Sequence, residues 1–115
     1  MLRDTLFILP MSFVSEGQNQ FCPECAELWG LISWFPVLKA SLEIVHVEID
    51  HPRPAITAVL GEGRHNAPTL VLGAGSERVR GLTYAESNGH AYLGSARLIA
   101  RHFAAIHGTP NPRGE

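Results

Sequence analysis

Two cysteines stand three positions apart, and they are the side chains of this sequence best suited to chemistry. Cys22 and Cys25 enclose Pro23 and Glu24. Pro23 suits the first turn of a helix, where its missing N–H costs nothing, and apolar residues recur at helical spacing after it. Cys22 is therefore expected at a helix N-terminus, where unpaired N–H groups and the helix dipole favour thiolate over thiol.

The spacing gives each cysteine a role in dithiol chemistry. Cys22 would attack a disulfide as the nucleophile. Cys25 lies within one helical turn, so it would resolve the mixed disulfide at Cys22 and release the partner as a thiol. Glu24 puts a carboxylate between the two thiols, and its charge should oppose thiolate formation. We therefore expect a reducing or moderate redox couple rather than a strong oxidant.

The same cysteines also fit half of a metal site. Cys22 and Cys25 have the C-x2-C spacing of a zinc half-site, and His46 with His51 would complete four ligands. However, His46 falls within a predicted strand and His51 lies just beyond its end, rather than on a zinc-finger helix. Zinc binding is therefore an alternative to redox chemistry, and ranks below it.

Apolar patterning predicts the elements that must position these residues. Residues 5–9 are a β-branched and aromatic run stopped by Pro10, which is typical of a buried strand, and residues 11–21 read as a loop. The helix that starts near Cys22 closes at Pro36. Further elements are expected along the chain: strands over 42–49, 69–72 and 90–93, a short helix over 53–60, and a last helix between Ser95 as N-cap and Gly108 as stop. The strand at 90–93 is preferred to one at 79–82 because it leads directly into that helix.

The whole chain reads as one α/β domain with its core over residues 5–107 and a flexible tail over 109–115. Its 115 residues suit a single domain, and 45% hydrophobic with 17% charged residues is a globular composition. A net charge of -2 gives no footprint for nucleic acid or an anionic membrane. We read the N-terminus as mature sequence and find no apolar run near the ~20 residues that cross a bilayer. A single close cysteine pair then makes the cytoplasm the expected location.

The order of elements, with Cys-Pro-Glu-Cys opening the first helix and Ala67-Pro68 before the third strand, resembles the thioredoxin superfamily over residues 5–107. It is most similar to the glutaredoxin and glutathione-transferase-like branch, and it looks like a bacterial family of uncharacterised thioredoxin-like proteins. The resemblance implies a thioredoxin-like fold, with a central four-stranded mixed sheet flanked by about three helices. It also implies that Pro68 takes the place of the cis-proline that faces the redox cysteines.

The resemblance and the topology together outline a substrate groove. Strands one and two should be parallel and strand three antiparallel to the first, which would gather Cys22, Pro68 and Ser95 at one sheet edge, with His51 and Arg53 nearby. Ser95 matches the position where relatives hold the γ-glutamyl end of glutathione, although Ser is also a favoured N-cap anywhere. The residues expected to contact substrate are Phe21, Pro23, Ala67, Ser95 and Arg53.

Function is expected to be thiol-disulfide exchange with a protein or small-molecule substrate and without a resident cofactor. Glutathione would be the co-substrate implied by the resemblance, but the loop over 11–21 is long and holds no Lys for the glutathione carboxylate. An iron–sulfur cluster shared between two chains through Cys22, as in some glutaredoxin-like relatives, is a second metal alternative. A redox-silent binding domain, which recruits a partner through the 11–21 loop, is the alternative from a different class.

Overall fold

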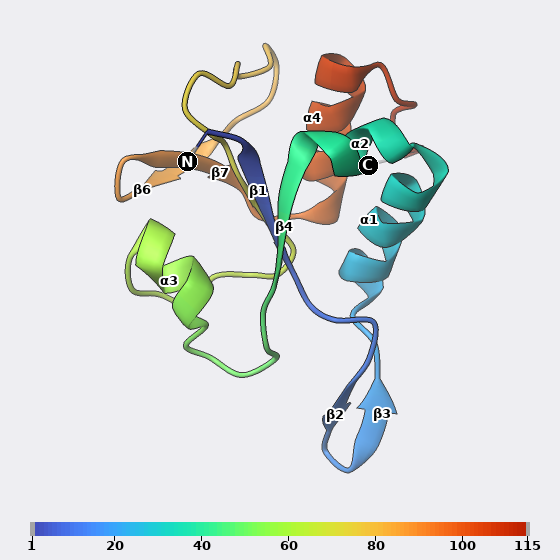
Figure 1. Ribbon diagram of the computed structural model, residues 1–115, viewed down its shortest axis with the longest axis vertical. Coiled ribbons are helices and arrows are strands. Elements are labelled where there is room, and N and C mark those ends of the chain that lie inside the picture. The colour runs from blue at the N-terminus through green and yellow to red at the C-terminus, as the bar shows by residue number, and fades with distance from the viewer. Residues whose placement is uncertain (1, 115) are drawn as a thin grey trace.

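The computed structural model describes residues 2–114 and has one mixed sheet with helices on both of its faces (Figure 1). The strands are β1 (Asp4–Ile8), β2 (Phe13–Ser15), β3 (Gln18–Gln20), β4 (Leu42–His46), β5 (Thr69–Val71), β6 (Ala85–Ser87) and β7 (His90–Leu93). The helices are α1 (Pro23–Trp34), α2 (Pro36–Ser41), α3 (Pro54–Leu60) and α4 (Ala96–His107). Helices α1, α2 and α4 gather on one side of the sheet, and α3 lies on the other.

The main sheet has the strand order β4-β1-β5-β7-β6. As predicted, β1 runs parallel to β4 and antiparallel to β5. The crossover through α1 and α2 makes the β1 to β4 connection, so the segment that follows β1 reaches α1 at the same edge where β4 ends. This confirms the α/β class, and the arrangement is compatible with a thioredoxin-like fold.

The sheet has five strands and the fold has four helices, rather than the four strands and about three helices expected. The additional strand, β6, joins β7 through a two-residue turn of Asn88 and Gly89, whose φ angles are 51° and 79°. Positive φ at both turn residues matches the twist of a hairpin. The additional helix, α2, begins at Pro36, which was expected only to end the preceding helix. Proline at a first helical position starts a new helix as readily as it closes an old one.

The segment over residues 11–21, expected as a loop, contains a hairpin of β2 and β3. These strands form a two-stranded sheet of their own, in which Val14 pairs with Asn19. Glu16 and Gly17 make the turn, with φ angles of 54° and 73°. Figure 1 shows the hairpin projecting from the body of the molecule, next to the start of α1. The hairpin therefore stands beside the cysteine pair.

The core lies between the sheet and the three helices on one face, with a smaller layer under α3. Its fully buried side chains come from β1, α1, α2, α3, β5, β7 and α4, and include Leu6, Ile8, Leu28, Leu38, Ile56, Leu70, Leu93, Ile99 and Phe103. Helix α4 has the predicted ends: the Ser95 hydroxyl accepts the Leu98 N–H at 3.3 Å, and Gly108 stops the helix at φ 76°. Within residues 2–114, no helix combines the length and hydrophobicity needed to cross a membrane.

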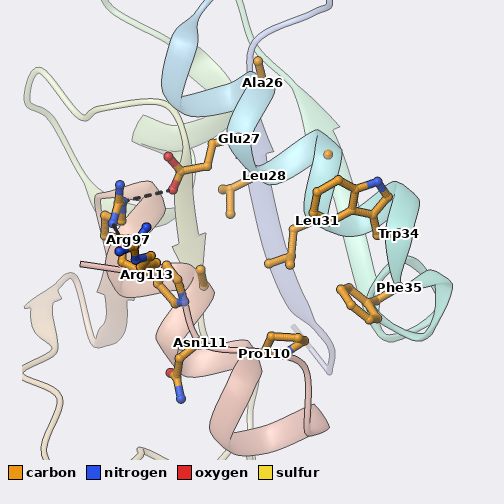
Figure 2. A pocket seen from close by; sticks show the side chains of 13 residues that line it. Ala26, Glu27, Leu28, Leu31, Trp34, Phe35, Arg97, Pro110, Asn111 and Arg113 are labelled. Carbon is orange, nitrogen blue, oxygen red and sulfur yellow. Dashed lines mark hydrogen bonds and ion pairs between the residues drawn. The ribbon is translucent and has the colours of Figure 1, made fainter. Parts of the chain in front are cut away.

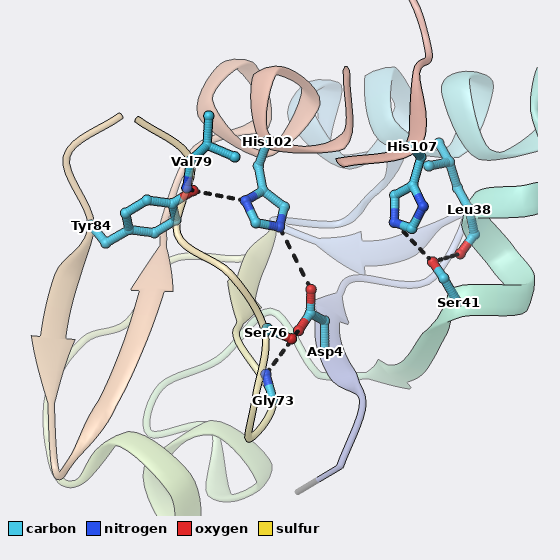
Figure 3. A network of polar contacts seen from close by, with 9 residues as sticks. All are labelled: Asp4, Leu38, Ser41, Gly73, Ser76, Val79, Tyr84, His102 and His107. Atoms are coloured by element: carbon cyan, nitrogen blue, oxygen red, sulfur yellow. Dashed lines mark hydrogen bonds and ion pairs between the residues drawn. The ribbon is translucent and has the colours of Figure 1, made fainter. Parts of the chain in front are cut away.

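A polar network, here called the Asp4–His102–Tyr84 network, joins α4 to β1 and to the segment before β6 (Figure 3). His102 is buried, with Nδ1 2.8 Å from the Tyr84 hydroxyl and Nε2 3.6 Å from the Asp4 carboxylate. The carboxylate also accepts the Gly73 N–H at 2.8 Å and the Ser76 hydroxyl. Burial alone would raise the pKa of Asp4, but these hydrogen bonds outweigh it, and the pKa lies below its ordinary value of 3.8. The network thus ties α4 to β1 and to the segment before β6.

Candidate active site

Cys22 occupies the N-cap position of α1, and Pro23 begins the helix. The Cys22 Sγ accepts the backbone N–H of Cys25 at 3.1 Å. Both cysteines are free thiols, but they differ in access, since Cys22 is partly exposed and only 2% of Cys25 is exposed. The start of α1 thus leaves Cys22 partly accessible to solvent and buries Cys25 in the core.

Burial changes the acidity of the inner cysteine. It raises the pKa of the Cys25 thiol to about 12, from an ordinary value of 9.0. The neighbouring Cys22 sulfur and the negative charge of Glu24 act in the same direction, and a hydrogen bond with the Leu9 backbone partly offsets them. Cys25 is therefore a protonated thiol at neutral pH.

The segment before β5 closes one side of the site. The Ala67–Pro68 peptide bond is cis, and both residues are buried. The Cys22 Sγ lies 3.8 Å from the Ala67 carbonyl oxygen, a distance that fits a weak S–H donor. The fold thus brings together Cys22 and the Ala67–Pro68 segment, which are 45 positions apart in the chain.

Glu24 links α1 to the start of α4. Its carboxylate accepts the backbone N–H of Ala96 at 3.0 Å and the side-chain N–H of Asn66 at 3.4 Å. Asn66 also donates to the Gly94 carbonyl at 2.8 Å. Glu24 accepts the first N–H of α4, and the Ser95 hydroxyl accepts the N–H of Leu98. The helix start where the γ-glutamyl end of glutathione was expected to bind is therefore already occupied by the carboxylate of Glu24.

Arg53 does not face the groove in which it was expected to contact substrate. It is 6% exposed, and its guanidinium donates to the carbonyl oxygens of Glu48, Ile49 and His65 at 2.8, 3.0 and 3.0 Å. Burial lowers the pKa of Arg53, and the charges of nearby Cys25 and Cys22 act in the opposite direction. Arg53 therefore ties the end of β4 to the segment before Pro68 and holds the backbone around the cysteines.

A hollow of about 130 Å³, here called the thiol hollow, opens beside the two sulfurs. It is lined by Pro10, Met11, Phe21, Cys22, Cys25, Ala26 and Trp29. Its rim is apolar and open to solvent, because 86% of Met11 and 62% of Phe21 is exposed. Phe21 was predicted to lie at the site, whereas Met11 and Trp29 were missed. Met11 follows Pro10 directly, so its position just after the first predicted strand could have indicated that it lies at the site.

The zinc ligand set predicted from spacing is not assembled. The His46 ring stacks on the Trp29 indole with ring centroids 5.8 Å apart. His51 lines a separate groove near α3 with Thr57 and Arg64. Across residues 2–114, no three side chains of His, Cys, Asp or Glu are grouped as a metal site would need. Sequence spacing suggested this set, but the parallel strand directs the two histidines to different surroundings.

A larger groove of about 630 Å³ lies between α1, α4 and residues 110–113 (Figure 2). Its walls are mostly apolar, with Leu31, Trp34 and Phe35 on one side. At its edge Glu27 and Arg97 form an ion pair with N···O 3.4 Å. Trp34 stands largely in solvent at this groove, with 79% of it exposed. The residues that line this groove include neither Cys22 nor Cys25.

The family described as "Protein of unknown function (DUF3088)" matches residues 3–111, a span that includes both cysteines and Pro68. The chain belongs to this family. No curated protein and no solved structure gave a significant match. Because the family description names no activity, the argument for function depends on the site itself.

Proposed function

We propose that this protein is a dithiol–disulfide oxidoreductase of the glutaredoxin and glutathione-transferase-like branch of the thioredoxin superfamily. One observation carries the proposal: the accessible Cys22 Sγ sits at the N-terminus of α1 and accepts the Cys25 N–H at 3.1 Å. An accessible sulfur at the start of a helix, with a second cysteine one turn away, is the arrangement that dithiol–disulfide exchange needs for attack and resolution.

Exchange would proceed in two displacements. The Cys22 thiolate attacks one sulfur of the substrate disulfide, the substrate S–S bond breaks, and the first substrate thiolate leaves and takes a proton from water. Cys25 then gives its proton to water and attacks the Cys22 Sγ, the S–S bond between Cys22 and the substrate breaks, and the second substrate thiolate leaves and is protonated by water. Two electrons pass from the dithiol to the substrate, and Cys22 and Cys25 end as a disulfide. The raised pKa of Cys25 supports this order, because a buried, protonated thiol is a poor first nucleophile.

The surroundings of Cys22 support a groove for substrate. The Ala67 carbonyl approaches the sulfur on one side, while Phe21 and Pro23 flank it on the chain that enters α1. The substrate would be a protein or small-molecule disulfide. We place the activity in the cytoplasm, where glutathione and thioredoxin systems keep such a pair reduced.

The test is the midpoint potential of the Cys22 and Cys25 couple. Free thiols are trapped across a series of glutathione redox buffers, and the products are weighed by mass spectrometry. We expect a reversible two-electron transition between about -200 and -270 mV, the range of glutaredoxins and thioredoxin. If no internal disulfide forms at any buffer composition, turnover is contradicted, and a redox-silent binding domain becomes the better description.

A further inference from the structure

Glu24 places a negative charge near Cys22, and the positive charge of nearby Arg53 is not available to a ligand. Glu24 is an exposed carboxylate two positions after the nucleophile, and its hydrogen bonds to Ala96 and Asn66 hold it in place. Arg53 is the cation whose charge interacts with both thiols, but it is buried and its donors are committed to three carbonyl oxygens. None of the residues that line the thiol hollow is charged, apart from the cysteines when ionised. An approaching substrate therefore meets the fixed negative charge of Glu24, while the donors of Arg53 are already engaged.

The start of α4 would otherwise attract an anion. Free N–H groups at a helix N-terminus bind carboxylates and phosphates. Here the Ala96 N–H already donates to Glu24, and the Leu98 N–H donates to Ser95. An anionic group brought close to Cys22 would find a carboxylate in the place where the helix would have offered a donor.

The thiol hollow adds a second preference. Its exposed rim, Met11 and Phe21, and its inner wall, Trp29, are apolar side chains. Groups next to the substrate sulfur atoms would lie against these surfaces and lose water there, which favours apolar groups over charged ones.

From these observations we infer that the substrates are disulfides flanked by apolar groups that are neutral or positively charged, and that Glu24 selects against anionic disulfides such as glutathione disulfide. The inference rests on the proposed function and specifies its substrate class. The chemistry is the two-step exchange described above, with the substrate disulfide as the oxidant of the reduced protein.

The experiment compares three small disulfides of similar size: cystamine, which is cationic, bis(2-hydroxyethyl) disulfide, which is neutral, and 3,3′-dithiodipropionate, which is anionic. The reduced full-length protein is mixed with each at neutral pH and low salt, and the loss of its thiols is followed in time. Each rate is divided by the rate of the same disulfide with dithiothreitol. This division removes differences in leaving-group chemistry and the charge effect common to any attacking thiolate, because dithiothreitol also attacks as a thiolate but lacks the surroundings of Cys22.

We expect the normalised rate for cystamine to exceed that for the dianion about tenfold, as one charge acting over a few ångströms in a partly solvated site allows. The neutral disulfide should fall between them, and glutathione disulfide should react like the dianion. Raising the salt to about 0.5 M should bring the two extremes to within about twofold, because exposed charges are then screened.

The variant Glu24→Gln tests the residue. It keeps an oxygen that can accept the Ala96 N–H but removes the charge, so the cation-to-anion ratio should fall at least about threefold. The matched control is Glu43→Gln, which removes the same charge from an exposed position near the start of β4, at the edge of the sheet away from Cys22. The control should leave the ratio unchanged.

The outcomes separate this inference from the proposed function. If the three disulfides oxidise the protein but the wild-type ratio is one or less, or Glu24→Gln leaves it unchanged, the charge selection is wrong and the oxidoreductase proposal stands. If no disulfide oxidises the pair, the proposed function fails and this inference fails with it. The salt dependence of the wild-type protein gives an answer even if the Glu24 variant folds poorly.

Discussion

The cysteine pair and the Asp4–His102–Tyr84 network lie at opposite ends of β1. They differ in how many of their polar atoms have hydrogen-bond partners and in how far those atoms are buried. In the network, the carboxylate and both imidazole nitrogens have partners, and the histidine is buried. At the pair, the Cys22 sulfur has one hydrogen bond from an N–H, a long contact to a carbonyl oxygen, and an open apolar rim. Satisfied polar groups stabilise a fold, whereas an accessible sulfur with few partners remains available for reaction.

The largest expected effect comes from Cys22→Ser. Its rate of disulfide reduction should fall by at least about 100-fold, because a serine hydroxyl is a far weaker nucleophile than a thiolate. The same change should leave urea unfolding almost unaltered, since Ser is a favoured N-cap and can accept the Cys25 N–H. A variant that kept full activity would show that Cys22 is not the nucleophile. Loss of stability would instead show that the two ends of β1 are not as different as the contacts indicate.

The converse change is Asp4→Asn. It should leave disulfide exchange intact while lowering the free energy of unfolding by about 2 kcal/mol, because charge-assisted hydrogen bonds to a partly buried carboxylate are lost. Urea unfolding at neutral pH measures the cost, with Glu43→Gln as an exposed carboxylate control that should change little.

The pH dependence of the same variant sharpens the test. The pKa of Asp4 is lower in the folded protein than its ordinary value of 3.8, so the ionised form stabilises the fold above that pH. This stability is lost as pH falls through 3.8 toward the folded-state pKa. The difference between wild type and Asp4→Asn should therefore shrink in acid, and a difference that stayed constant would contradict the role given to the charge.

A further effect is expected from Cys25, and it is confined to high pH. Its pKa rises from 9.0 to about 12 on folding, so the folded protein holds the proton more tightly than the unfolded chain does. The stability of the reduced wild type should therefore decline as pH rises from about 9 toward 12, and it should decline less in Cys25→Ala. Urea unfolding under a reducing agent measures both, and parallel curves would argue against a buried thiol at this position.

The sequence was most informative where local pattern decides structure. The alternating strands, the Pro23 helix start and the Ser95 cap all depend on neighbouring residues, and they were predicted close to their observed positions. The missing strand, β6, had a local signal too, because Asn88 and Gly89 are a typical hairpin turn. The hairpin of β2 and β3 was harder to predict, since Gln18–Gln20 is a polar run with little strand propensity.

The site was less predictable because its decisive contacts are distant in sequence. Nothing near Glu24 in the chain indicates that it will reach Ala96, 72 positions away. The position of Arg53 suggested the site, but its burial against three carbonyl oxygens depends on how β4 and the segment before Pro68 come together. Local pattern thus located Cys22 at the start of α1, and tertiary structure decided which charges surround it.

The hairpin of β2 and β3 forms the entrance of the thiol hollow, and this entrance can open locally without the rest of the fold. Met11 and Phe21, which form the rim, stand at the two ends of the hairpin, and its strands pair with each other rather than with the main sheet. Segments with few buried contacts open at much lower free energy than a core does. The entrance can therefore open locally while its floor, on buried Cys25, keeps its place in the core.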